Sequence, residues 1–271
     1  MKELFSLSLE TIRKKGFIYF LRKVIVNVSR NLLENFKNFL LNYFGILFRR
    51  CFLNKFRRLI DSSMDTEGIV DLVFSFSQFG ISITPSQVRE EIIKLLKLIN
   101  RINPKVIVEI GTFRGGTLFL FTRVADPKAT IISVDLPGGR FGGGYPKWRI
   151  PLYRSFTKDN QKLYLIRGDS HNINTYKEVK RILGDYKVDF LFIDGDHRYE
   201  GVKRDFNIYS PLVKEGGVIA LHDIVPHDRV HNPSGTVGVS KFWNEIKNNY
   251  KYLEIVKSWE QGWAGIGVLY L

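Results

Sequence analysis

Cysteine is almost missing from this chain, which has one, Cys51, in 271 residues. A single thiol excludes an intramolecular disulfide and is typical of a protein from a reducing compartment, so we expect a cytoplasmic location. No cysteines or histidines have the spacing of a structural zinc site.

Long hydrophobic runs are missing as well. The longest nearly apolar stretch, residues 39–48, has ten residues and contains Asn42, whereas a membrane-spanning helix needs about 20. The first 60 residues also lack a small-residue cleavage site, and basic side chains recur throughout them. We therefore expect neither a spanning helix nor a signal peptide.

Acidic residues are scarce only near the beginning of the chain. Residues 1–60 contain 13 Lys and Arg against 3 Glu, and so carry +10 of the formal net charge of +14. The other 211 residues have 28 basic and 24 acidic side chains, a net charge of +4. This near-neutral part lacks the cationic face that a phosphate backbone requires, which argues against nucleic acid as a partner.

Residues 1–60 combine their cations with many aromatic and aliphatic side chains, as in NFKNFLLNYFGILFRRCFLNKFRRLI. Two interpretations stay open. A basic amphipathic helical region would lie on an anionic membrane surface, which would place the protein peripherally on the inner membrane face. Alternatively, these helices pack on the main domain or on a second subunit. Packing on a second subunit would make the protein a homo-oligomer.

Three parts follow from these composition changes: a basic, apolar helical extension (1–60), a connector (61–83) and a main domain (84–271). The connector is expected to hold one short helix. The sequence TPSQ at residues 84–87 predicts the start of the next helix, with a threonine cap, a proline in the first turn and a capping box completed by Gln87.

Strands and helices then alternate along the main domain. We predict strands at residues 105–110, 130–135, 163–167, 188–194 and 216–222, helices near 115–125, 172–183, 198–212 and 238–248, and two final strands near 252–257 and 265–270. Continuous apolar strands such as VDFLFID are typical of a sheet covered on both faces. The sequence therefore predicts an α/β fold with a doubly wound, mostly parallel, seven-stranded sheet.

A glycine turn follows the first of these strands. Its pattern is E-x-G-x-x-x-G, formed by Glu109, Gly111 and Gly115, and Asp135 ends the second strand 20 residues after Gly115. The glycines let the backbone pass close to a ligand, and the carboxylate can accept hydrogen bonds from two ribose hydroxyls. Phe113 stands where a dinucleotide needs a glycine, which argues against NAD or FAD. An acidic strand end suits a cationic ligand such as S-adenosylmethionine; the alternative is a turn without a ligand.

Acidic and imidazole side chains follow the fourth and fifth strands. Asp194 ends the fourth, with Asp196 and His197 after it, and His222 and Asp223 end the fifth. Because these strand ends share one crevice, we expect Asp194, His222 and Asp223 to converge on a divalent cation such as Mg²⁺. His197 is expected to be a general base. The alternatives are that Asp196 and His197 cap the next helix, and that His222 lies beside the ligands.

Two loops adjoin these residues. The loop over 135–156 is long and rich in glycine and proline, so we expect a lid. Its aromatic residues would either stack on a ligand or pack within the loop: Tyr145, Trp148 and Tyr153. The loop over 224–237 is polar and is expected to shape the pocket beside Asp223, with His227 and His231 on the surface.

Five ordered motifs carry a family resemblance: VEIGTFRGGT, SVDLPGG, RGDSHN, DFLFIDGDHRYEGVKRDF and GGVIALHDI. Together they resemble class I S-adenosylmethionine-dependent methyltransferases, and most closely the macrolide-sugar O-methyltransferase and cephalosporin hydroxylase-like family. The resemblance covers about residues 80–271 and implies the Rossmann-like, seven-stranded fold of these enzymes. It does not extend to residues 1–60.

The resemblance implies a role for each matched position. The cofactor would be S-adenosylmethionine, with its methionine part lined by Glu109, Gly111, Thr112 and Gly115, its ribose bound by Asp135, and its adenine near Asp169 and Ser170. Asp194 and Asp223 would hold a divalent metal, and His197 would be the base. Related enzymes often carry another polar group at the position of His222, which leaves the identity of the metal open.

The implied reaction is metal-assisted O-methylation of a hydroxyl on a small molecule or a glycan sugar. Three alternative functions are to be compared with this one. A nucleic-acid methyltransferase would normally have an Asn/Asp-Pro-Pro-aromatic motif after strand four, where this chain has Asp194-Gly195-Asp196-His197. A non-catalytic, membrane-attached cofactor-binding module would not need the Asp and His set. An iron oxygenase that uses His222, Asp223 and His227 would leave the glycine turn unexplained.

Overall fold

The computed structural model describes Asn54 and residues 64–271, apart from 79–80, 139–143 and 159. The predictions for the basic extension therefore lie outside the described residues, and the division into three parts stays a prediction. Within the described part of the chain, no helix is long and apolar enough to cross a membrane.

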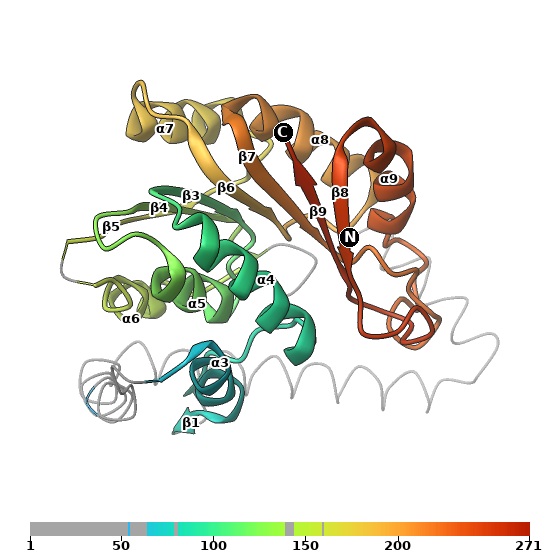
Figure 1. The fold of residues 1–271 in the computed structure, drawn as a ribbon, viewed down its shortest axis with the longest axis horizontal. Coiled ribbons are helices and arrows are strands. Elements are labelled where there is room, and N and C mark those ends of the chain that lie inside the picture. The colour runs from blue at the N-terminus through green and yellow to red at the C-terminus, as the bar shows by residue number, and fades with distance from the viewer. Residues whose placement is uncertain (1–53, 55–63, 79–80, 139–143, 159) are drawn as a thin grey trace, which may run out of the picture. The chain divides into compact units, whose positions relative to one another are not determined.

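A seven-stranded sheet occupies the centre of the described chain (Figure 1). Five strands are parallel: β3 (Val106–Ile110), β4 (Thr130–Asp135), β5 (Lys162–Arg167), β6 (Val188–Ile193) and β7 (Val213–His222). β8 (Lys251–Ile255) and β9 (Ile266–Tyr270) form an antiparallel pair, through which β9 joins β7. The order is β5-β4-β3-β6-β7-β9-β8, so the chain reverses direction across the sheet between β3 and β6. Ligands bind at such switch points, outside the carboxyl ends of the strands.

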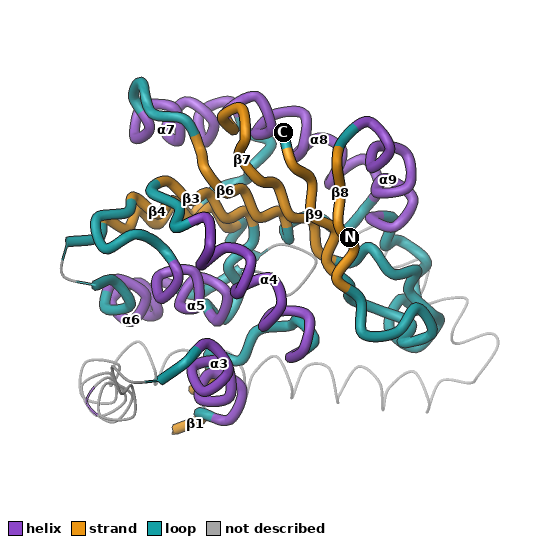
Figure 2. Tube along the Cα trace, viewed as in Figure 1, coloured by secondary structure: helices purple, strands orange, loops and turns teal. Residues whose placement is uncertain are grey.

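Helices cover both faces of this sheet (Figure 2). One face carries α4 (Arg89–Ile102), α5 (Gly116–Val124) and α6 (Ile150–Arg154), and the other carries α7 (Ile173–Leu183), α8 (Tyr199–Tyr209) and α9 (Val239–Ile246). Every residue of the central strands β3 and β6 is buried, which explains their continuous apolar sequences. The predicted doubly wound, mostly parallel fold is confirmed.

The packing between the sheet and α7, α8 and α9 forms one continuous apolar core. It includes Val108 and Leu191 from the central strands, Phe206 from α8 and Trp243 from α9. The short 3₁₀ helices η1 (Lys147–Arg149), η2 (Ser210–Leu212) and η3 (Lys247–Asn249) connect the larger elements. Because both faces are packed, the side chains free to meet a ligand lie at the strand ends.

The first helix of the main domain begins later than the sequence predicts. α4 starts at Arg89 after Val88, whose side chain makes no capping hydrogen bond, so the predicted capping box at residues 84–87 is wrong. Gln87 is instead buried and bonded to a residue 107 positions further along the chain. The predicted short helix of the connector is α3 (Thr66–Ser75), and the paired β1 (Ser77–Gln78) and β2 (Ile81–Ser82) were not predicted.

Candidate active site

Two neighbouring cavities open at the carboxyl edge of the parallel strands. One, of about 290 Å³, lies beside the ends of β4 and β5, and we call it the β4 cavity. The other, of about 310 Å³, lies beside the end of β7, and we call it the β7 cavity. Both volumes are near the lower end of the usual range for ligand pockets, roughly 300–1,000 Å³. Gly111, Phe113 and Asp194 line both cavities.

The glycine turn after β3 forms the boundary between the cavities. Gly111 has a φ of 92°, and a Cβ there would lie 2.1 Å from the carbonyl oxygen of Asp194, so only glycine fits. Beneath the turn, the fully buried Glu109 accepts hydrogen bonds from the hydroxyls of Thr117 at 2.6 Å and Thr112 at 2.9 Å. Burial raises the pKa of Glu109 to about 8, although these hydroxyls favour the charged form. Glu109 therefore holds the turn in place.

Asp135 points into the β4 cavity from the end of β4. Its Oδ2 atom accepts hydrogen bonds from the backbone amides of Phe113 at 2.7 Å and Thr112 at 3.2 Å. Burial raises the pKa of Asp135 to about 6, even though the two amides favour the carboxylate. Hydroxyl donors in the cavity would stabilise the same charged form.

The structure distributes the predicted cofactor residues over different places. Four of them line the β4 cavity: Gly111, Asp135, Asp169 and Ser170. Thr112 lines the β7 cavity, while Glu109 and Gly115 line neither. A Cβ at Gly115 would lie 2.6 Å from the Tyr153 ring, so this glycine serves the packing of the turn.

The aromatic residues of the loop after β4 mostly pack within the protein. Tyr145 and Tyr153 are buried, and their ring centroids lie 4.8 Å apart in an edge-to-face contact. Of the two interpretations, packing within the loop applies to both tyrosines. The guanidinium of Arg149 lies 4.7 Å from the ring centroid of Trp148. Residues 139–143, which include three of the five glycines of the expected lid, lie outside the described residues.

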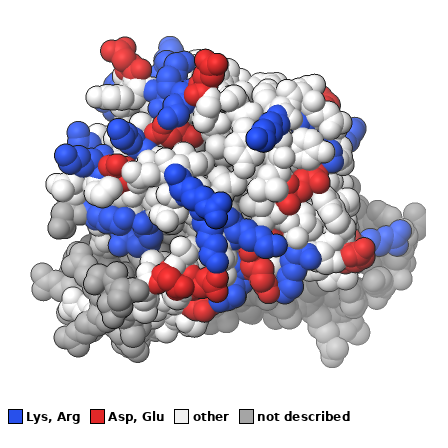
Figure 3. All heavy atoms as spheres, in the orientation of Figure 1, with Lys and Arg blue, Asp and Glu red and all other residues white. Residues whose placement is uncertain are grey.

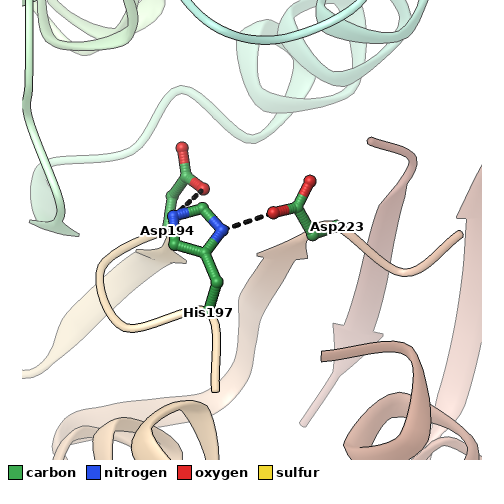
Figure 4. Close-up of side chains that lie close together, drawn as sticks. All are labelled: Asp194, His197 and Asp223. Atoms are coloured by element: carbon green, nitrogen blue, oxygen red, sulfur yellow. Dashed lines mark hydrogen bonds and ion pairs between the residues drawn. The ribbon is translucent and has the colours of Figure 1, made fainter. Parts of the chain in front are cut away.

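His197 lines the β7 cavity and lies between Asp194 and Asp223 (Figure 4). Its Nδ1 atom hydrogen-bonds Oδ2 of Asp223, and its Nε2 atom lies 3.9 Å from Oδ1 of Asp194. One potential metal-ligating atom from each residue lies within 4.8 Å of the others. The histidine of this potential metal-binding group is His197, whereas the sequence analysis expected His222.

His222 is buried beside the same carboxylates. Its Nδ1 atom lies 3.0 Å from Oδ1 of Asp194 and 3.3 Å from Oδ1 of Asp223. Burial lowers the pKa of His222, but the charges of Asp194 and Asp223 outweigh it and raise the pKa to about 9. Its Nε2 atom has no hydrogen-bond partner among the described residues. The predicted Asp194, His222 and Asp223 are thus brought together, with His197 beside them.

Asp223 is the most highly connected carboxylate of this group. Burial acts to raise its pKa, but the charge of His222, the hydrogen bond of His197 and the close approach of His227 hold the pKa well below the usual range. Its φ of 70° is rare for a non-glycine residue and signals backbone strain of the kind found at functional sites. The expected surface position of His227 is wrong, because its side chain is 8% exposed and its Nε2 lies 3.0 Å from Asp223.

Other residues of the β7 cavity come from distant parts of the chain. Gln87, 3% exposed, donates a hydrogen bond from Nε2 to Oδ2 of Asp194 at 2.7 Å. His231 stacks on Trp263, with ring centroids 5.6 Å apart, and both line the cavity. Sequence reasoning missed Gln87 because its local pattern resembles a helix cap, and it missed Trp263 because no motif surrounds that residue.

A second imidazole–carboxylate pair adjoins the β4 cavity and was also missed. His171 lines the cavity next to Asp169 and Ser170, and its Nε2 atom lies 3.2 Å from Oδ1 of the buried Asp205. His171 belongs to the motif RGDSHN, so its position next to Asp169 was the available signal. Asp205 on α8 has no such signal, because acidic residues are common on the exposed faces of helices.

The central part of the chain is similar to known proteins. Residues 108–224 match the family described as "Methyltransferase domain". A protein of Acanthamoeba polyphaga mimivirus, R132, is 32% identical over 127 residues, which are 43% of this chain and 50% of that protein. The probable caffeoyl-CoA O-methyltransferase 1 of Dictyostelium discoideum is 23% identical over 148 residues, 52% of this chain and 56% of the relative. The matched part therefore spans about half the length of these relatives.

Solved structures share the fold at low sequence identity. The O-methyltransferase from Bacillus cereus in complex with SAH has a TM-score of 0.51 at 15% identity, over 79% of this chain and 96% of that one. A putative caffeoyl-CoA O-methyltransferase from Staphylococcus aureus has a TM-score of 0.55 at 19% identity, over 83% of this chain and 99% of that one. At these identities the likeness establishes the fold.

Proposed function

We propose that this chain, whose residues 108–224 match a methyltransferase domain, is a class I S-adenosylmethionine-dependent enzyme that methylates a hydroxyl oxygen of a small molecule or a glycan sugar. One observation carries the proposal: the β4 and β7 cavities meet at Gly111 and Asp194, with a buried carboxylate in the first and His197 with Asp223 in the second. A methyl donor in the β4 cavity and a hydroxyl in the β7 cavity would meet at this boundary.

The residues of the β4 cavity fit the adenosyl cofactor. The Asp135 carboxylate lines the cavity and suits the two ribose hydroxyls, and Asp169 and Ser170 would lie by the adenine. At Gly111 the missing side chain permits close approach of the backbone. When bound, S-adenosylmethionine would supply the methyl group on its sulfonium sulfur.

His197 is the proposed base, and it would accept the proton of the acceptor hydroxyl at Nε2. Asp223 holds its Nδ1 atom by a hydrogen bond, which orients the ring and stabilises the imidazolium that forms. Burial lowers the pKa of His197, but the hydrogen bond and charge of Asp223 outweigh it and raise the pKa above its usual value. The pair therefore strengthens His197 as a proton acceptor.

A divalent cation such as Mg²⁺ also fits this site. Asp194 and Asp223 supply oxygen atoms, and either His197 or His222 supplies a nitrogen, which is a suitable donor set. A cation would make the acceptor hydroxyl more acidic. Since the carboxylates of Asp194 and Asp223 face both imidazoles, protons on His197 and His222 would compete with the cation. A cation held by His197 would exclude the role of this residue as base.

Surface charge supports a small acceptor rather than a nucleic acid. On the face drawn in Figure 3, Lys and Arg side chains, some of them adjoining one another, are interspersed with Asp and Glu and leave wide uncharged areas. A protein that binds a phosphate backbone usually presents a cationic stripe. The membrane interpretation of residues 1–60 would favour a glycan near the inner membrane face, and sedimentation with anionic vesicles would test it.

Calorimetric titration with S-adenosylmethionine and S-adenosylhomocysteine tests the cofactor first, with Asp135→Ala as the control. Transfer of a labelled methyl group to a panel of catechols, hydroxylated amines and free sugars then tests the reaction, with and without EDTA. Micromolar binding and transfer that is lost in His197→Ala would support the proposal. A folded protein that binds the cofactor but methylates nothing would favour a non-catalytic binding module.

A further inference from the structure

The loop after β5 is held from one side by α8. The hydroxyl of Tyr209 donates a hydrogen bond to the carbonyl oxygen of Ser170 at 2.9 Å, and Nη2 of Arg204 donates to that of His171 at 3.1 Å. The His171 imidazole also turns towards this helix, with Nε2 3.2 Å from Oδ1 of Asp205. These contacts fix the backbone and the side chain of the loop that borders the β4 cavity.

Asp205 is a fully buried carboxylate with few partners that balance its charge. Among the described residues, His171 is the only cationic partner within 4.0 Å of it, and no hydrogen-bond donor satisfies its oxygen atoms. A buried carboxylate is tolerated when an opposite charge balances it. The interaction with Asp205 raises the pKa of His171, against the effect of burial. Asp205 therefore favours the charged form of the His171 ring.

The opposite edge of the His171 ring is available to a ligand. The Nε2 edge is engaged by Asp205 and by the carbonyl oxygen of Gly201, which lies 3.1 Å away. The Nδ1 atom lies 3.8 Å from Oδ1 of Asp169, which is too far for a hydrogen bond. His171 lines the β4 cavity, and its side chain is 14% exposed. In its charged form the ring therefore presents to the cavity an Nδ1–H donor that no described residue accepts.

We propose that His171 is a purine-binding residue, and that Asp205 is the positioning residue that holds its imidazolium against the β4 cavity. The Nδ1–H group would donate a hydrogen bond to a ring nitrogen of the adenine, because these nitrogens are acceptors. The inference rests on the proposed function, since it requires an adenosyl ligand in this cavity. It adds a charged donor to the predicted neighbours of the adenine, Asp169 and Ser170.

The test is calorimetric titration of the full chain with S-adenosylhomocysteine, with melting temperatures recorded for each variant. His171→Gln should weaken binding about tenfold, as expected for a lost charge-assisted hydrogen bond. It should also lower the melting temperature, because Asp205 then lacks its counter-charge. The double variant His171→Gln/Asp205→Asn removes both charges, so it should recover the melting temperature while its binding stays about tenfold weaker.

A purely structural role for His171 predicts the opposite result for the double variant. If that variant both melts and binds as the wild-type protein does, the purine contact is wrong. Should Asp205→Asn fail to fold, His171→Lys keeps a cation beside Asp205 without the ring donor and must still lose affinity. The ligand 5′-methylthioadenosine, which lacks the amino-acid part, should lose affinity by the same factor. No binding of either ligand to the wild-type protein would instead overturn the proposed function.

Discussion

The side-chain amide of Gln87 donates a hydrogen bond to Asp194 over 2.7 Å, although 107 residues separate the two in the chain. Asp194 accepts from Gln87 at Oδ2 and faces His222 at Oδ1. A segment that precedes the family-matched residues 108–224 thus fixes a carboxylate of the site. The Oε1 atom of Gln87 is buried without a partner among the described residues, so an acceptor hydroxyl in the β7 cavity could satisfy it.

Replacement of Gln87 by leucine should lower methyl transfer by roughly ten- to a hundredfold, because Asp194 loses a donor that fixes its orientation. Binding of S-adenosylhomocysteine should change little. The matched control is Gln161→Leu, since Gln161 is another buried glutamine, which is bonded to the carbonyl oxygen of Thr122 and lines neither cavity. That variant should lose stability and keep its activity. Equal activities in the two variants would argue against a role for Gln87 in the site.

The hydrogen bond between His197 and Asp223 predicts similar defects in two variants. His197→Gln and Asp223→Asn should each lower the rate of methyl transfer by about 10²–10⁴, because the first removes the base and the second leaves it unoriented. Neither residue lines the β4 cavity, so titration with S-adenosylhomocysteine should give wild-type affinity. Steady-state rates of labelled methyl transfer measure the loss. Full activity in His197→Gln would remove the proposed base.

Cofactor affinity should depend on pH through Asp135. Burial raises the pKa of this residue to about 6 in the free protein, and ribose hydroxyls bind its ionised form. Affinity for S-adenosylhomocysteine should therefore fall as the pH drops below about 6, by up to about tenfold per unit, and recover between pH 6 and 7. Asp135→Asn should bind weakly at every pH and show no such step. A step that persists in Asp135→Asn would have to come from another group.

Stability should depend on pH through Glu109. The pKa of this residue rises from 4.5 to about 8 on folding because of its burial, so the folded state holds the proton more tightly. The stability that the folded state gains from this proton is fully present below pH 4.5 and is lost as the pH rises towards 8. Glu109→Gln should flatten this slope and stabilise the protein at pH 8 by roughly 2 kcal/mol. Urea unfolding between pH 6.5 and 8.5 measures the free energy of unfolding of both proteins. If this free energy changes with pH in the same way in the two proteins, the prediction is wrong.

The regular elements were predictable because their signals are local. Continuous apolar strands and the glycine turn after Ile110 indicated the sheet and its switch point, and Asp194, His197, His222 and Asp223 follow strand ends that the topology brings together. Contacts between distant segments were not predictable. Gln87 has the sequence context of a helix cap, yet its hydrogen bond to Asp194 determines its position.

The positions of two histidines were also not predictable from the local sequence. Sequence spacing put His227 in a polar loop, which suggested a solvated side chain, whereas the left-handed backbone at Asp223 brings it back onto that carboxylate. His171 and Asp205 lie 34 residues apart on different elements, so only the packing of α8 against the loop after β5 pairs them. Both histidines are positioned by a buried carboxylate, and burial of that carboxylate is a property of the folded chain.

Among the described residues, the β4 cavity is lined only by residues between 110 and 198, whereas the β7 cavity also takes residues 85–87 and residues from 222 to 263. The proposed donor and acceptor pockets are therefore encoded in largely separate stretches of sequence. Under this proposal, insertions or exchanges in the loop after β7 should alter which acceptor is recognised while the donor pocket stays intact. Such modularity would let one ancestral domain diversify its substrates by changing its flanks, and loop grafting offers a practical route to re-target it.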